Sequence, residues 1–149
     1  MRWSKWKDVK LADVATIERA KAGKVYPFGC SLIPLSAWQI ESISFLEQPT
    51  EVSGRYAVII PDASKVLPRY LFMCVEDSAE EFEAQYVTGI NLQHDILVQY
   101  FTVKVHEDFE CIEAIEDRLE AIDLMQAQEA RVVNKLQDLK AGFLENIFV

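Results

Sequence analysis

The chain of 149 residues is 50% hydrophobic and 11% aromatic, which allows a packed core and excludes a disordered protein. Its formal net charge of −9 disfavours a nucleic-acid partner, but the charge is unevenly distributed. Residues 1–24 carry seven basic and three acidic side chains (7 − 3 = +4), residues 25–109 carry four and twelve (4 − 12 = −8), and residues 110–149 carry four and nine (4 − 9 = −5). A basic local surface therefore remains possible.

Several classes of protein are disfavoured by the pattern of residues. The longest apolar runs, such as 57–60 and 71–75, are too short to span a membrane, and the N-terminus lacks the apolar core of a signal peptide, so a cytoplasmic protein is expected. The cysteines, Cys30, Cys74 and Cys111, are odd in number and widely spaced, which argues against a disulfide framework and against a zinc site. No metal and no cofactor is expected.

The first third of the chain predicts short strands joined by loops. Residues 9–17 fit a strand that runs into a turn of helix, and residues 20–29 contain the Gly and Pro residues of a loop. Residues 31–37 and 41–46 are predicted strands, and in the second of these apolar and Ser residues alternate, as in a strand with one buried face.

The middle of the chain predicts one buried strand and one short helix. After a predicted turn at 49–54, residues 55–60 form a continuous apolar run that is typical of a strand covered on both faces. Pro68 fits the first position of a helix that is predicted to end at Val75. The acidic segment 76–83 is interpreted as a solvated face or loop rather than a metal site, because its carboxylates lack regular ligand spacing.

The last third predicts a short helix, a strand and then a long helix. Asn91 is a plausible N-cap for a helix over 92–97, and residues 99–105 alternate like a strand with one buried face. Residues 113–147 contain no Pro and predict a helix about 50 Å long. The fold class is α+β: a small mixed or antiparallel sheet domain over 1–109, followed by one long C-terminal helix over 110–149.

A helix of this length carries an apolar stripe that a domain of about 110 residues cannot bury completely. In a heptad frame one core position takes Ile115, Ile122, Glu129, Leu136 and Phe143, and the other takes Leu119, Gln126, Val133, Lys140 and Ile147. An antiparallel self-pair would bring Gln126 and Glu129 near the symmetry axis, whereas a parallel pair would oppose Glu129 with itself. Alternatively, the first turns of the stripe fold back on the chain's own domain.

Several segments, in this order, resemble the specificity (S) subunits of Type I restriction–modification systems. The opening Trp6–Ile17 with Lys21–Lys24 is similar to the start of a target recognition domain, and Thr88–Leu92 to its closing segment. Further similar segments are Ile33–Ala37, Gly54–Ile60 and Leu67–Phe72, and the end of the chain is similar to the family's spacer helix at Ile122-Asp123, Gln128-Glu129, Leu136, Leu139-Lys140, Leu144 and Ile147-Phe148. Family members usually carry two recognition domains and two such helices, so this chain resembles a half-length form.

The resemblance implies a non-catalytic subunit that reads one half of a bipartite site in double-stranded DNA. The helix would form an antiparallel homodimer and dock a DNA methyltransferase (modification) subunit and a restriction subunit. The candidates for contacts to bases or phosphates are Lys21, Lys24, Tyr26, Ser36, Trp38, Arg55 and Arg69.

Two other functions remain open. No Gly-rich phosphate loop, GxSxG or HExxH motif is present, which disfavours an enzyme that acts alone. The acidity of the chain would suit an interaction or regulatory protein that pairs with S or methyltransferase subunits without binding DNA itself. An ordinary solvated loop is at least as good an interpretation of Lys21, Lys24 and Tyr26 from the residues alone.

Overall fold

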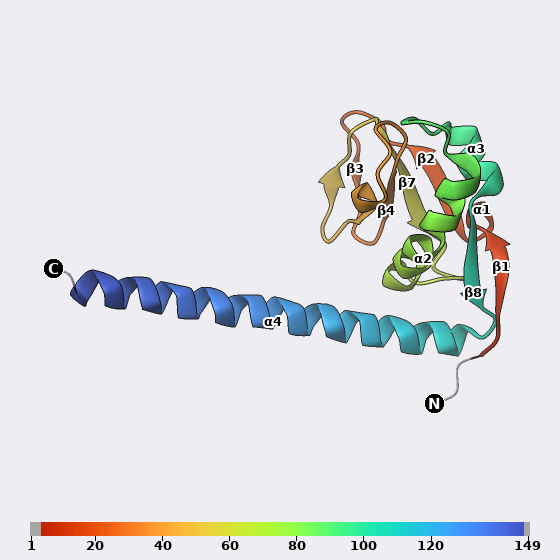
Figure 1. Cartoon of the computed structure of the whole chain (residues 1–149). Helices are drawn as coiled ribbons and strands as arrows, with labels where there is room; N and C mark the ends of the chain where they lie inside the picture. Colours follow the sequence, from red (N-terminus) through yellow and green to blue (C-terminus); the bar gives the residue numbers. More distant parts are fainter. Residues whose placement is uncertain (1–3, 148–149) are drawn as a thin grey trace. The chain divides into compact units, whose positions relative to one another are not determined.

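The chain is a mixed α+β protein with antiparallel sheets and a long C-terminal helix, as predicted (Figure 1). The computed structural model describes residues 4–147, and for residues 144, 146 and 147 it describes the backbone alone. The chain divides into two compact units, Met1–Glu116 and Asp117–Val149. The first unit extends past residue 109 because Cys111 and Ile112, in the first turns of the long helix, are buried in its core.

The main sheet has four antiparallel strands in the order β2 (Ala15–Arg19), β7 (Tyr56–Pro61), β4 (Ser31–Pro34) and β5 (Ser44–Phe45). Strand β7 is an interior strand, and its central residues Ala57, Val58 and Ile59 are fully buried. Because side chains alternate along a strand, Ala57 and Ile59 belong to one apolar cluster and Val58 to a second one on the other face. The prediction of a strand covered on both faces is confirmed.

A second ladder joins the two ends of the first unit. Strand β1 (Trp6–Lys10) pairs antiparallel with β8 (Thr102–His106), and the short helix α1 (Leu11–Val14) connects β1 to β2. On β8 the side chains of Val103 and Val105 are buried and those of Thr102 and Lys104 are exposed, which confirms the predicted alternation. Helix α3 (His94–Tyr100) precedes β8, so the strand begins later than residue 99.

Some predicted loops and strands differ from those observed. The predicted loop 20–29 and turn 49–54 each contain a two-residue strand, β3 (Val25–Tyr26) and β6 (Thr50–Glu51), and these pair antiparallel with one another. The predicted strand 41–46 is reduced to β5, because a 3-10 helix, η1 (Ile40–Ser42), occupies its beginning. These short elements depend on a partner segment distant in sequence, which periodicity within one segment does not reveal.

Helix α2 (Pro68–Tyr86) is much longer than the predicted segment that ends at Val75. Its buried face continues through Ser78, Ala79 and Phe82, at the three- and four-residue spacing of a helix. The acidic side chains of this segment lie mostly on its exposed side, so the run is a solvated face of a helix. Figure 1 shows α2 next to β8, which it contacts together with β4 and β5.

The N-terminus of α2 is capped by a residue from a distant part of the chain. Leu67 precedes the helix and offers no side-chain cap. Instead, the buried carboxylate of Glu116 accepts hydrogen bonds from the backbone N–H groups of Tyr70 at 2.7 Å and Arg69 at 3.2 Å. An anion at this position satisfies helix donors that would otherwise lack partners. Glu116 therefore attaches the beginning of the long helix to α2.

The long helix, α4 (Phe109–Ile147), begins four residues before the predicted start at Glu113. Within the first unit, Cys111, Ile112 and Glu116 are buried and Ile115 packs against the core. The interpretation that the first turns fold back on their own domain is thus confirmed. Among the described residues, no helix combines the length and the apolarity that crossing a bilayer requires.

The cysteine thiols are buried, and we expect them to be unreactive in the native protein. Burial raises the pKa of Cys30, and it raises the pKa of Cys74 to about 12, so little thiolate exists at pH 8. Ellman's reagent should therefore modify the native protein at least ~100-fold more slowly than the chain in urea. A native reaction as fast as that of glutathione would contradict this burial.

Candidate nucleic-acid interface

One end of the four-stranded sheet gathers basic side chains from separate segments. Arg19 ends β2 and pairs in register with Ala57, near the beginning of β7, and Arg55 directly precedes β7. The backbone N–H of Ala20 donates to Tyr56 O at 3.0 Å, which places Lys21 at the same end. Arg19, Lys21 and Arg55 are all exposed, so a local positive charge exists on a protein of net charge −9.

A hollow of about 450 Å³ lies at this end of the sheet, and we call it the strand-end hollow. Its volume falls within the range of known ligand-binding sites. Its walls come from the end of β2, the segment after β4, the loop before α3 and the first turn of α3, and they are mainly polar. The lining residues are Arg19, Leu35, Ser36, Asn91, Leu92, Gln93, His94 and Asp95.

The walls of the strand-end hollow are held together by backbone hydrogen bonds. Leu92 N donates to Leu35 O at 2.8 Å, and Trp38 N donates to Ile90 O at 2.7 Å, so the loop before α3 is fastened to the segment after β4. Arg19 Nε donates to Gly54 O at 2.9 Å, which orients its guanidinium group. The hollow is therefore a preformed feature of the first unit.

Three of the seven predicted contact residues lie at this end of the sheet. Ser36 lines the hollow, and Lys21 and Arg55 are exposed beside it, with the Arg55 guanidinium 5.4 Å from the centre of the Tyr56 ring. Arg55 is tied to the hollow through its backbone, because Arg55 O accepts a hydrogen bond from Leu35 N at 2.7 Å.

The predicted DNA contacts of Tyr26 and Trp38 are corrected, because both side chains are buried and present no ring to a base. Tyr26 is fully buried in the second apolar cluster, and its hydroxyl accepts a hydrogen bond from Lys21 N at 3.0 Å. The Trp38 ring lies in the main core near Phe82, and its Nε1 donates to Glu83. Both aromatic side chains contribute to the fold.

Arg69 and Lys24 are already engaged within the protein. The Arg69 guanidinium is largely buried, 3.9 Å from the Glu116 carboxylate and 5.2 Å from the centre of the Phe28 ring. Lys24 pairs with Glu18 at 2.7 Å, and this hydrogen bond holds the pKa of the Glu18 carboxyl below its usual value. Neither residue lines the strand-end hollow.

Four residues that line the hollow are absent from the predicted contact residues: Arg19, Asn91, Gln93 and Asp95. Asn91 was interpreted as the N-cap of a helix over 92–97, but α3 begins at His94 with Gln93 in the preceding position, and Asn91 faces the hollow instead. The sequence carries one signal for Asn91 and Gln93, because these two polar residues flank the apolar Leu92. The side chain of Leu92 is 5% exposed, and the two polar neighbours are exposed.

Replacing Tyr26 with phenylalanine should lower the free energy of unfolding by about 1 kcal/mol, because the Lys21 N–H loses its acceptor. Urea unfolding measures this loss. Tyr100→Phe is the matched control, since Tyr100 is 45% exposed and should tolerate the change. A Tyr26→Phe variant of unchanged stability would refute the structural role of this hydroxyl.

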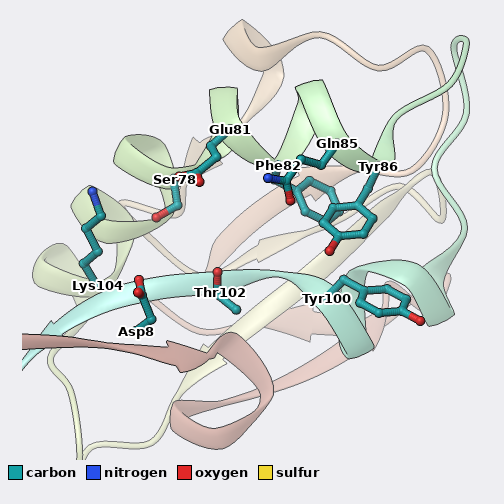
Figure 2. A pocket seen from close by; sticks show the side chains of 9 residues that line it. All are labelled: Asp8, Ser78, Glu81, Phe82, Gln85, Tyr86, Tyr100, Thr102 and Lys104. Carbon is teal, nitrogen blue, oxygen red and sulfur yellow. The ribbon is translucent and has the colours of Figure 1, made fainter.

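A smaller pocket lies between α2, α3, β8 and β1, and Figure 2 shows its lining side chains. Asp8 and Lys104 face each other across the β1–β8 ladder, and the rings of Tyr86 and Tyr100 stack with centres 5.0 Å apart. Its volume of about 100 Å³ is well below the roughly 300 Å³ of the smallest ligand pockets. This space suits a few water molecules rather than a nucleobase.

Beyond Glu116, α4 carries a row of exposed apolar side chains. Ile122, Leu136 and Phe143 are 49%, 61% and 64% exposed, and Val133 is 48% exposed. The predicted row is modified at one end, because Ile115 packs against the core of the first unit. The side chain of Ile147 lies outside the described residues.

The exposed row also includes Met125, Val132 and Leu139, which the heptad frame omitted. They alternate at three- and four-residue spacing with the first core position of that frame. The resulting row, which we call the α4 seam, is Ile122, Met125, Glu129, Val132, Leu136, Leu139 and Phe143. Within this row Glu129 alone is polar. The α4 seam is thus more apolar than a frame through Gln126 and Lys140.

No family model matches the chain, and no curated protein matches it.

Proposed function

We propose that the chain is a non-catalytic DNA-recognition subunit, a half-length relative of the specificity subunits of Type I restriction–modification systems. The first unit is the recognition domain and α4 is its spacer helix. The observation that carries the proposal is the strand-end hollow, where polar side chains capable of base contacts are flanked by Arg19, Lys21 and Arg55.

The local charge at the hollow favours DNA despite the overall acidity. Asp95 is the acidic residue of the lining, whereas the acidic face of α2 belongs to a different element. Lysine and arginine contacts to phosphates supply most of the affinity of DNA-binding proteins and make it dependent on salt. We therefore expect weak binding by a single chain and a steep loss of binding as the salt concentration rises.

Self-pairing through the α4 seam would place two recognition domains on one bipartite site. Residues 117–129 carry one basic and four acidic side chains (1 − 4 = −3), and residues 130–147 carry three and two (3 − 2 = +1). An antiparallel pair brings these unlike halves together, whereas a parallel pair opposes Glu129 with Glu129. Methylation and cleavage would belong to separate modification and restriction subunits docked on the pair.

The test is a selection from a random duplex library with the purified protein, alone and together with the adenine methyltransferase (modification) subunit of a Type I system. The proposal expects enrichment of a symmetric, two-part sequence, with an affinity that falls at least tenfold between 50 and 200 mM salt. Enrichment of no sequence by either sample would refute DNA recognition.

The second candidate function is an interaction protein that pairs with S or methyltransferase subunits without binding DNA. The exposed α4 seam and the net charge of −9 favour it, since both suit a protein partner. Co-purification with such a subunit, combined with a DNA sequence preference that does not change when the chain is added, would support this function over the first.

A further inference from the structure

We propose that Asn91 and Gln93 read base edges in the major groove, with a preference for adenine, while Arg19 and Arg55 hold the adjacent phosphates. This inference rests on the proposed function and assigns separate roles to the two kinds of side chain at the strand-end hollow.

The loop before α3 presents the two amides to the same side. Leu92 is 5% exposed and its backbone is bonded to Leu35, so its side chain anchors the loop in the core. Gln93 has an extended backbone, with φ −75° and ψ 135°. Because neighbouring side chains alternate in extended chain, the anchoring of Leu92 turns Asn91 and Gln93 outward, and both line the hollow.

The chemistry of a carboxamide matches one base edge in particular. An Asn or Gln side chain can accept a hydrogen bond from N6 of adenine and donate one to N7 at the same time. Two exposed amides separated by one residue thus suit neighbouring base pairs. Backbone hydrogen bonds attach this loop to the Leu35–Trp38 segment, so the position of the two amides is defined before DNA binds.

The charges in the hollow determine which side faces the phosphates. Asp95 lies next to the amides and repels a phosphate group there, whereas Arg19 and Arg55 lie at the strand ends. The DNA backbone should therefore run along the arginine side, with the base edges toward the amides. The Asp95 carboxylate can itself accept a hydrogen bond from N4 of cytosine.

The experiment compares duplex selections by the wild-type chain, Asn91→Ala, Gln93→Ala and Arg55→Ala, each in the assembly that binds DNA most tightly. Thr88→Ala is the matched control, because Thr88 is exposed on the same loop but does not line the hollow. Thermal unfolding of every variant verifies the fold. We expect Asn91→Ala and Gln93→Ala to lose roughly tenfold to hundredfold preference at one base position each, and to keep binding.

Arg55→Ala should weaken binding to all sequences alike and lower the salt dependence by about one phosphate contact. Uniform weakening by the amide variants would overturn the inference, because it would assign them to the phosphates. An unchanged sequence preference would also overturn it, while leaving DNA recognition intact. A wild-type chain with no preference at all would refute the proposed function, and this inference with it.

Discussion

Leu136→Asp should abolish the self-pairing that we propose for the α4 seam. Leu136 is 61% exposed within the α4 seam, and a self-pair would bury it in each of two copies. The pair would then bury one carboxylate from each copy without a partner. This should raise the dissociation constant at least a hundredfold, which corresponds to a loss of about 3 kcal/mol in the free energy of association. Sedimentation equilibrium over a range of concentrations measures this change.

The matched control for the proposed dimer is Leu124→Asp. Leu124 is 59% exposed and lies two residues after Ile122, on the opposite side of the helix. It should leave the dissociation constant nearly unchanged, and both variants should retain the stability of the first unit. Sedimentation of the wild-type chain as a monomer at high concentration would eliminate the homodimer.

Glu116→Ala should lower the free energy of unfolding of the first unit by about 2–4 kcal/mol. The substitution removes the acceptor for two backbone N–H groups of α2 and leaves the largely buried guanidinium of Arg69 without this carboxylate at 3.9 Å. Urea unfolding followed by circular dichroism, with attention to the transition of the first unit, gives the difference.

Two further variants test this cap. Glu113→Ala removes an exposed carboxylate from the same helix and should change stability by less than about 0.5 kcal/mol. Glu116→Gln keeps an acceptor oxygen but removes the charge, so it should recover part of the loss. Equal stabilities of Glu116→Ala and Glu113→Ala would show that the cap contributes nothing.

The features that periodicity controls were predictable from the sequence. The interior strand β7, the alternation on β8 and the long helix each follow from a local pattern of apolar residues. The end of α2 was mispredicted because a dense acidic run resembles a loop, although Ser78, Ala79 and Phe82 continue its buried face. Composition outweighed spacing in that interpretation, and spacing determined the structure.

The candidate site was less predictable, because it depends on contacts between distant segments. The burial of Tyr26 and Trp38 follows from tertiary packing. The residues next to them in the sequence do not distinguish an aromatic ring in the core from one that faces a ligand. The hollow unites Arg19 with Ser36 and Asn91 across three segments, which no local spacing could reveal. The exposure of Lys21 and Arg55 is easier to expect, because charged side chains are mostly exposed.

The cap at Glu116 shows the same limit. A helix N-terminus that begins with Leu67-Pro68 carries no capping residue in its own sequence, and the carboxylate that completes it comes from residue 116. Nothing in the acidic, helical segment 113–120 distinguishes Glu116 from its neighbours except its position on the buried face of α4.

The position of β7 between two apolar clusters has a consequence for the way the first unit unfolds. Because Val58 belongs to one cluster and Ala57 and Ile59 to the other, neither cluster can open without disturbing the same strand. Residues 4–116 should then behave as one cooperative unit, and the amide hydrogens of Ala57–Ile59 should exchange with solvent through global unfolding. Hydrogen exchange at these amides would therefore report the full stability of the first unit.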